Sequence, residues 1–348
     1  MSQLKQLDDF GARMGDLIGK DLDFEPLALE LFRLQSRSVG PLHSLCESRG
    51  IDPDRLADWR QIPAMPTTMF KEFELTSLPA DDRPYFFLSS GTTEQVRSRH
   101  FHNDTSMRLY ERSLMTWFSP NVVEDRTFAH MISLTPPPES VPNSSLVHMF
   151  DQVGPTQFFG GLESDEWVVD FEALIQKLED AKGPVLLMGT AFSFVHVLDW
   201  MKSNHRELQL PPRSRVMETG GYKGRSRVIP KSELHRKIRI RFGIEEDDVL
   251  CEYGMSELSS QAYDTGRGNE DERRFRFPPW ARALIVSPET GEEVADGEIG
   301  LLRIFDLANV WSVMAIQTED LALKHGNEFE LIGRFPEAEP RGCSLTSA

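Results

Sequence analysis

The residues most suited to chemistry form the run Ser89-Ser90-Gly91-Thr92-Thr93, which directly follows the apolar stretch Tyr85–Leu88. Glycine lets a backbone approach a ligand closely, and backbone N–H groups together with Ser and Thr hydroxyls donate hydrogen bonds to anions. The run therefore predicts a strand that leads into a phosphate-binding loop. It is not a P-loop, because the pattern GxxxxGK[ST] is absent. By itself, such a run is also typical of an ordinary turn.

Three motifs further along the chain favour the phosphate-loop interpretation. They are Glu252-Tyr253-Gly254-Met255-Ser256-Glu257, Thr318-Glu319-Asp320 and Gly333-Arg334. In order and content, the four motifs resemble those of the adenylate-forming superfamily, whose members activate carboxylic acids with ATP. Each motif alone is a weak signal, whereas the four in this order are far more specific.

This resemblance implies a set of ATP- or AMP-binding residues and a metal ligand. The residues that it assigns to the nucleotide are Ser89, Ser90, Gly91, Thr92, Thr93, Tyr253, Gly254, Asp320 and Arg334. Gly220 and Gly221 follow a predicted strand, where glycine would let adenine lie flat against the backbone or would form a tight turn. Tyr253 would lie beside adenine, and Asp320 would accept hydrogen bonds from both ribose hydroxyls. Glu257 would bind Mg2+, which needs only one or two carboxylates beside the phosphate oxygens. Each position also has a plainer interpretation: a turn, a helix cap or, for Arg334, the protein surface.

The flanking residues indicate a narrower family. The stretches Gly220-Gly221-Tyr222-Lys223-Gly224-Arg225, Glu252 to Gln261 and Pro340-Arg341-Gly342-Cys343-Ser344-Leu345 are similar to those of the acyl-protein synthetases of bacterial bioluminescence and their relatives. The similarity covers most of the chain, from the phosphate loop to the end. It implies a fatty-acid–protein ligase that makes an acyl-adenylate. The acyl group would then pass to a cysteine near the C-terminus, a position that Cys343 matches.

The C-terminal end is expected to differ from that of most adenylate-forming enzymes. In that superfamily a mobile C-terminal domain brings a lysine to the adenylation site, but here the chain ends at Ala348, too soon after Arg334 for such a domain. We expect the tethered thiol of Cys343 to act as acyl acceptor, because tethering raises its local concentration. The alternative is a free cysteine on a frayed tail. Lys223 or Lys231 could replace the absent lysine, although nothing singles out either.

Composition limits the function classes. The chain has 348 residues, of which 39% are hydrophobic, and a formal net charge of −17. Such a charge repels nucleic acid and anionic membranes. Three cysteines are too few for a disulfide framework, and an odd number would leave one without a partner. With no signal-peptide core at the start and no apolar stretch that suits a membrane span, we expect a cytoplasmic protein.

Apolar spacing predicts an alternation of helices and strands. The predicted helices are Phe24–Ser38, Met69–Leu75, Thr105–Phe118, Phe171–Leu178, Phe192–Met201 and a basic helix that Ser232 caps and that ends at Arg241. The predicted strands are Tyr85–Leu88, Phe128–Leu134, Pro184–Met188, Arg215–Thr219, Val249–Glu252, Ala283–Val286, Glu298–Phe305 and Phe329–Ile332. This alternation indicates α/β layering with largely parallel sheets.

The expected fold class is therefore α/β, the layered core of an adenylate-forming enzyme without its mobile C-terminal domain. Within a core at 1–334, we expect a helical N-terminal part (1–80), a nucleotide- and acyl-binding part (81–270) and a β-rich subdomain (271–334). The tail at 335–348 carries Cys343.

Three further residues are candidates for contact with the acid. His130, on a predicted strand, would face the substrate carboxylate or else be an ordinary core histidine. Phe192 and Phe194 would line an acyl tunnel, although aromatic residues on an apolar helix more often belong to the core.

The sequence thus predicts an ATP- and Mg2+-dependent ligase that activates a carboxylic acid, expected from the resemblance to be a fatty acid. Its acyl group would pass to Cys343 and then to a partner acyl reductase. Two alternatives stay open. One is an enzyme of the same fold that acylates coenzyme A or a carrier protein, and the other is a nucleotide-binding protein without catalytic activity.

Overall fold

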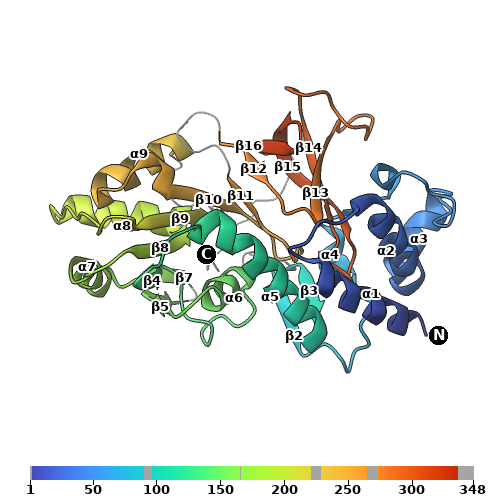
Figure 1. Cartoon of the computed structure of the whole chain (residues 1–348), viewed down its shortest axis with the longest axis horizontal. Coiled ribbons are helices and arrows are strands. Elements are labelled where there is room, and N and C mark those ends of the chain that lie inside the picture. Colours follow the sequence, from blue (N-terminus) through green and yellow to red (C-terminus); the bar gives the residue numbers. More distant parts are fainter. Residues whose placement is uncertain (1, 90–95, 165, 221–228, 265–272, 336–348) are drawn as a thin grey trace.

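The computed structural model describes residues 2–89, 96–164, 166–220, 229–264 and 273–335 (Figure 1). Its helices are α1 (Gln3–Leu17), α2 (Phe24–Ser38), α3 (Gly40–Ser48), α4 (Met69–Glu72), α5 (Asp104–Phe118), α6 (Ser145–Gln152), α7 (Phe171–Glu179), α8 (Ala191–Ser203) and α9 (Lys231–Phe242). Its strands are β1 (Met65–Pro66), β2 (Tyr85–Leu88), β3 (Arg99–His102), β4 (His130–Ser133), β5 (Thr156–Phe158), β6 (Gly160–Glu163), β7 (Glu166–Val169), β8 (Val185–Thr190), β9 (Arg215–Thr219), β10 (Val249–Tyr253), β11 (Ala262–Asp264), β12 (Phe275–Arg276), β13 (Ala281–Val286), β14 (Ile299–Asp306), β15 (Ala315–His325) and β16 (Glu328–Arg334).

Twelve of the described strands pair into one mixed sheet. Its order is β13-β14-β15-β16-β12-β11-β10-β9-β8-β4-β5, and β1 pairs with β15. The strands from β10 to β5 run parallel, whereas those from β10 to β13 run antiparallel. The predicted α/β class is confirmed, but the sheet is mixed rather than largely parallel, because its second half is built from hairpins.

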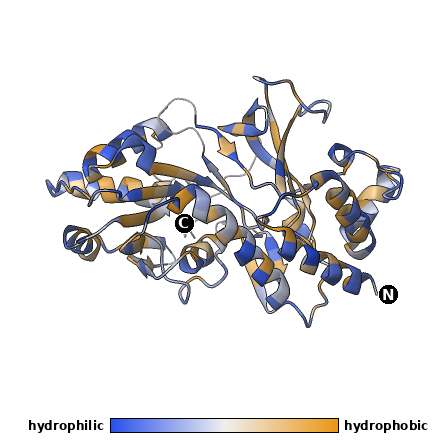
Figure 2. Cartoon of the chain, in the orientation of Figure 1, coloured by the Kyte–Doolittle hydropathy of each residue, from blue (hydrophilic) through white to orange (hydrophobic). Residues whose placement is uncertain are grey.

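Helices cover both faces of the parallel half, so its strands are apolar on both sides. Along β8, Val185 and Leu187 pack with α7, α8 and α9, while Leu186 and Met188 pack with α5 and α6. Figure 2 shows the same pattern as hydrophobic colouring along these strands and mixed colouring around the surrounding helices. The carboxyl ends of the parallel strands are thereby fixed in one layer between two sets of helices.

The N-terminal helices pack against the antiparallel half of the sheet, on the right of Figure 1. Leu7, Phe10 and Met14 are fully buried on α1, and their spacing places them on one face of the helix. Trp311 Nε1 donates a hydrogen bond to Asp8 Oδ1 over 2.9 Å. Residues near the start of the chain and residues beyond 300 therefore share one hydrophobic core.

Strands β2 and β3 form a separate antiparallel pair. Just beyond the pairing, Ser89 N donates to Ser98 O over 3.1 Å and Ser98 N donates to Ser89 Oγ over 2.9 Å. Ser89 and Ser98 are therefore adjacent at the end of this strand pair. In the sequence, the predicted phosphate-binding run lies between the two strands.

Most predicted helices and strands agree with the structure to within a few residues, and α2 and β9 have the predicted bounds. Two helices begin one or two residues before the predicted starts. Asn103 caps α5 by accepting from the Thr105 and Ser106 backbone N–H groups, and Pro230 precedes α9, so that Ser232 lies inside that helix. The long strand β15 was not predicted, because burial along it does not alternate regularly.

Candidate functional site

Two parallel strands of the central sheet end side by side at the candidate site. β9 ends at Thr219 and β10 at Tyr253, and each is followed by a glycine. Gly220 has a φ of +75°, a conformation that glycine adopts without strain. Ligands of open α/β sheets bind at the carboxyl ends of the strands, often where the connectivity reverses. This edge of the sheet is therefore the natural place for the motifs to meet.

The Tyr253 ring is held by an aromatic cluster. It makes edge contacts with Phe275, Phe277 and Phe329 at centroid distances of 6.2, 6.2 and 5.7 Å. Its hydroxyl donates to Asp320 Oδ2 over 2.8 Å. Two motifs separated by 67 residues of chain are thus joined directly.

Asp320 also contacts the third motif. It is the cross-strand partner of Arg334, and Asp320 Oδ1 lies 3.4 Å from Arg334 Nε. Arg334 forms a second ion pair with Glu319. A carboxylate oxygen has two lone pairs, so Asp320 keeps acceptor capacity for a ligand hydroxyl. Tyr253, Asp320 and Arg334, predicted from separate motifs, therefore come together in the structure.

Glu257 lies four residues after Tyr253 and is 1% exposed. Ser256 Oγ donates to Glu257 Oε2 over 3.0 Å, and Asn309 Nδ2 donates to the Glu257 carbonyl oxygen over 2.8 Å. Within the described part of the chain, Glu257 Oε1 has no hydrogen-bond partner. A buried carboxylate oxygen without a partner is costly, so this atom is available to a cation or donor.

Several predicted site residues lie outside the described residues: Ser90, Gly91, Thr92, Thr93, Gly221, Cys343 and the alternative lysine Lys223. Ser89 is described and holds the end of β2 through its bonds with Ser98. Gly254 is described, and a Cβ atom there would come within 2.4 Å of Glu252 Oε1.

The structure corrects the three candidates for contact with the acid. His130 begins β4, opposite the first residue of β8, so it lies at the amino end of the parallel strands and away from the site. Phe194 is fully buried in the core formed by α7, α8 and α9. Phe192 packs on His196, and residues two apart on a helix point in different directions. The two phenylalanines therefore do not line one tunnel.

A buried polar cluster behind β9 and β10 was missed by the sequence analysis. Glu218 Oε1 accepts from Cys251 Sγ at 2.9 Å, from Lys231 Nζ at 3.1 Å and contacts His235 Nε2 at 3.0 Å. Burial alone would raise the pKa of Glu218, but these neighbours hold it below its usual range. Lys231 is thus committed to an ion pair with Glu218, and Cys251 is completely buried in the core.

A second buried acid, Glu252, was also missed. Thr219 Oγ1 donates to it across the ends of β9 and β10. Burial raises the pKa of Glu252 to about 7. An apolar strand gives no hint that its fourth residue, a glutamate, points inward, and only the paired register with β9 makes this visible.

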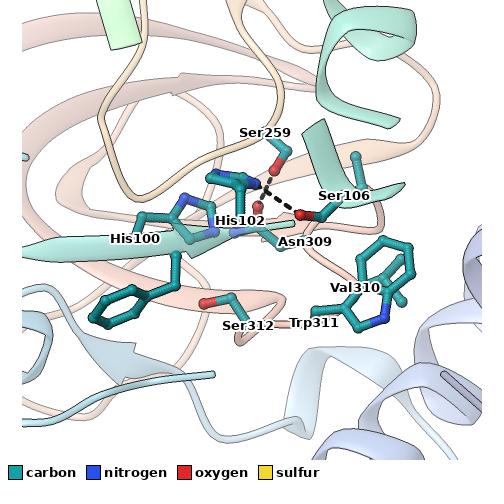
Figure 3. Close-up of a pocket in the computed structure, with 10 residues that line it drawn as sticks. His100, His102, Ser106, Ser259, Asn309, Val310, Trp311 and Ser312 are labelled. Atoms are coloured by element: carbon teal, nitrogen blue, oxygen red, sulfur yellow. Dashed lines mark hydrogen bonds between the residues drawn. The ribbon is translucent and has the colours of Figure 1, made fainter. Parts of the chain in front are cut away.

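A small cavity lies beside the residues that follow Glu257 (Figure 3). His100 and His102 on β3, Ser106 on α5, and Ser259 and Asn309 line it. His102 Nε2 has no hydrogen-bond partner among the described residues. The alternation His100-Phe101-His102 was the one sequence signal for this cavity, because it puts both imidazoles on the same face of a strand.

No group of three or more His, Cys, Asp and Glu side chains suited to a metal ion occurs among the residues that the structure describes. Three carboxylates among the described residues have a buried oxygen without a hydrogen-bond partner, namely Glu218, Glu257 and Asp264, and of these Glu257 lies in the motif that follows β10.

Comparison with known proteins identifies the family. The family model described as "Acyl-protein synthetase, LuxE" matches residues 27–348. This chain belongs to the acyl-protein synthetase family. The predicted family and the predicted ligase class are confirmed.

Two curated relatives of this acyl-protein synthetase are long-chain-fatty-acid–luciferin-component ligases. The protein from Aliivibrio fischeri is 26% identical over 317 residues, which cover 85% of this chain and 80% of the relative. The protein from Vibrio harveyi is 23% identical over 320 residues, which cover 86% and 81%.

Solved structures similar to this acyl-protein synthetase include 2-hydroxyisobutyryl-CoA ligase in two states. Its open conformation with 2-HIB-AMP and CoA gives a TM-score of 0.64 at 13% identity and covers 88% of this chain and 74% of that one. Its postadenylation state gives 0.66 at 12% identity, with 89% and 66% covered. These likenesses confirm the adenylate-forming fold.

None of the described helices combines the length and apolar composition needed to cross a bilayer.

Proposed function

We propose that this protein uses ATP to activate a long-chain fatty acid as its acyl-adenylate and then transfers the acyl group to a thiol. Family membership and the names of the two curated relatives support the acid and the ligase chemistry. The observation that carries the proposal is the meeting of Tyr253, Asp320 and Arg334 at the carboxyl edge of β10.

Each of these residues has a role in the proposed reaction. Tyr253 offers an aromatic surface to adenine, and its cluster with Phe275 and Phe329 keeps the ring in place. Asp320 accepts hydrogen bonds from the ribose hydroxyls, and the ion pair with Arg334 orients its carboxylate. With the nucleotide fixed, a carboxylate oxygen of the acid attacks the α-phosphorus, an O–P bond forms, and pyrophosphate leaves.

Glu257 fits the proposed Mg2+ site, because its Oε1 is buried without a hydrogen-bond partner in the described residues. Mg2+ favours carboxylate and phosphate oxygens, and one protein carboxylate is enough when a triphosphate supplies the rest. When bound, Mg2+ would neutralise charge on the departing pyrophosphate.

We propose Cys343 as the acyl acceptor and a partner acyl reductase as the next recipient. In the transfer, the thiolate attacks the acyl carbon, a thioester forms and AMP leaves. Thiolate rather than thiol is the nucleophile, so this step favours a pH near or above the thiol pKa. The cytoplasm stays the predicted location, because sparse unpaired cysteines suit a reducing compartment.

Intact-mass spectrometry tests this function. The purified chain is incubated with ATP, Mg2+ and fatty acids of graded length, beside the variant Cys343→Ser. We expect the wild type to gain the mass of one fatty acid less one water, and the variant to gain nothing while it still releases pyrophosphate.

Two outcomes contradict parts of this proposal. Pyrophosphate release from the wild type without a mass gain would mean that the acceptor is an external thiol. Absence of acid-dependent pyrophosphate release with every acid would contradict adenylation itself.

A further inference from the structure

The segment 256–260, which carries Glu257, is held by the buried side chain of Asn309. Asn309 is 1% exposed. Its Nδ2 donates to the Glu257 carbonyl oxygen over 2.8 Å and to the Val313 carbonyl oxygen over 3.3 Å. Its Oδ1 accepts from Ser259 Oγ over 2.6 Å. One amide therefore fixes both the glutamate backbone and the residue two positions later.

Asp306, at the end of β14, anchors the other end of the same segment. Its Oδ2 accepts from Ser259 N over 2.9 Å, and its Oδ1 accepts from Ser260 Oγ over 2.8 Å. Burial raises the pKa of Asp306 to about 6. The loop that follows β14 therefore makes a continuous set of hydrogen bonds to the Glu257 segment.

A third contact comes from β3, the strand that follows the phosphate-binding run. His100 Nδ1 lies 2.9 Å from the Ser256 carbonyl oxygen, and His100 is 3% exposed. Burial lowers the pKa of His100 to about 4, so the ring is neutral at pH 7. A carbonyl oxygen only accepts, so Nδ1 carries the proton and donates it to this bond.

These contacts leave one atom of Glu257 uncommitted. The carbonyl groups of Ser256 and Glu257 are both bonded to side chains from other elements, and Oε2 accepts from Ser256 Oγ. Of the two carboxylate oxygens of Glu257, Oε1 is the one that lacks a hydrogen bond in the described residues. Figure 3 shows His100, His102 and Asn309 around the cavity that Ser259 of this segment also lines.

We propose that Asn309 and His100 are positioning residues that orient the Glu257 carboxylate toward the Mg2+ of bound Mg–ATP. The inference rests on the proposed role of Glu257 as the metal ligand. Groups that orient a metal ligand from outside the coordination sphere affect metal affinity by about 10–100-fold when removed. His100 lies on β3, so the same contact ties this strand to the segment that carries the proposed metal ligand.

Gln35 on α2 provides a matched control. It is fully buried, donates from Nε2 to the carbonyl oxygens of Asn309 (2.7 Å) and Val310 (3.0 Å), and accepts from Met314 N (3.0 Å). It thus has the same amide chemistry, burial and number of hydrogen bonds as Asn309, and it holds the same loop. It makes no hydrogen bond to the Glu257 segment among the described residues.

The experiment measures the dissociation constant of ATP by calorimetry, once with saturating Mg2+ and once with EDTA, on the full chain without acid. The ratio of the two constants reports how much the metal tightens binding. We expect Asn309→Ala to reduce this ratio by about tenfold, with the EDTA value close to wild type. Gln35→Ala should lower the melting temperature but leave the ratio unchanged.

A second pair of variants covers the case that Asn309→Ala does not fold. His100→Ala removes the donor to Ser256, whereas His100→Asn keeps an N–H donor close to the position of Nδ1. We expect the ratio to fall in His100→Ala and to recover in His100→Asn.

Glu257→Gln distinguishes the proposed metal role of Glu257 from the proposed positioning role of Asn309 and His100. If this variant keeps the wild-type ratio, the proposed metal role of Glu257 is wrong. If it loses the ratio while Asn309→Ala behaves like Gln35→Ala, or His100→Asn behaves like His100→Ala, the role of Glu257 stands and the positioning inference is overturned.

Discussion

At the scale of single residues, Glu252 is a carboxylic acid buried in the sheet beside the candidate site. It is 4% exposed, and Thr219 provides its hydrogen bond. Burial raises its pKa from 4.5 to about 7, because water no longer solvates the charge. The folded state therefore holds this proton more tightly than the unfolded chain.

This gives the protein a pH-dependent stability with a defined sign. Between about pH 4.5 and 7 the folded state binds more protons than the unfolded state, so the free energy of unfolding falls as pH rises. Glu252→Gln removes this contribution and keeps a partner for Thr219. Its stability relative to wild type should increase by about 2–3 kcal/mol from about pH 5 to about pH 8.

Urea unfolding at both pH values measures the change. Glu289→Gln, on an exposed turn after β13, serves as the control and should give the same difference at both. A constant difference for Glu252→Gln would mean that Glu252 is ionised in the folded protein at both pH values.

At the scale of elements, Glu218 joins three of them. From β9 it contacts Cys251 on β10 and both Lys231 and His235 on α9. Glu218 is fully buried, whereas the Lys231 side chain keeps 38% of its surface exposed. The carboxylate therefore depends on these partners more than the lysine depends on it.

Lys231→Gln tests how much this junction contributes. The substitution leaves the fully buried Glu218 carboxylate without its counter-charge, and breaking a buried pair from one side costs about 3 kcal/mol or more. We expect a loss of about 3 kcal/mol in urea unfolding. Glu233→Gln, whose ion pair with Lys237 at 2.6 Å is partly exposed, should lose less than about 1 kcal/mol. Equal losses would show that the junction adds nothing beyond a surface pair.

Elements with strong local patterns could be predicted from the sequence. The apolar spacing in Phe24–Ser38 and the short apolar run Arg215–Thr219 fix their own bounds, because neighbours in the chain decide them. β15 could not be predicted, since three of its eleven residues in a row, Glu319, Asp320 and Leu321, are only half-buried. Its pairing with β14 and β16 holds it as a strand.

The residues of the candidate site likewise include some that a sequence pattern marks and others that no pattern marks. Tyr253, Asp320 and Arg334 could be predicted because motifs name them, and the structure adds that they touch. Asn309 could not be found, because its contact with Glu257 spans 52 residues and no pattern in the sequence marks it. The predicted position of His130 differs from the observed one, because the sequence of a strand does not show which of its two ends lies at the site. His130 lies at the amino end of β4.

At the scale of the whole molecule, helix α1 packs the N-terminal part of the chain against the antiparallel half of the sheet. Gly11 lies against Trp311, where a Cβ atom would come within 2.4 Å of a ring carbon. One turn later, a Cβ on Gly15 would meet only Leu109 Cδ1, at 4.0 Å. Two glycines of one helix therefore differ only in what faces them.

Alanine at each position separates packing from helix propensity. Alanine in a helix is favoured over glycine by about 1 kcal/mol, so Gly15→Ala should raise stability by up to that amount. Gly11→Ala should lower it by about 1–3 kcal/mol, because the rigid indole cannot move aside without disturbing the core. Thermal unfolding of both variants measures the difference, and a stabilised Gly11→Ala would mean that α1 sits less tightly on this half than the structure indicates.

The Tyr253 ring belongs to two parts of the molecule. It packs with Phe275 and Phe329 as a core residue, and its hydroxyl holds Asp320 at the candidate site. A substitution at this position would therefore disturb both the packing of the core and the hydrogen bond that holds Asp320. We accordingly expect members of the family to vary less at this position than at residues that make only one of these two contributions.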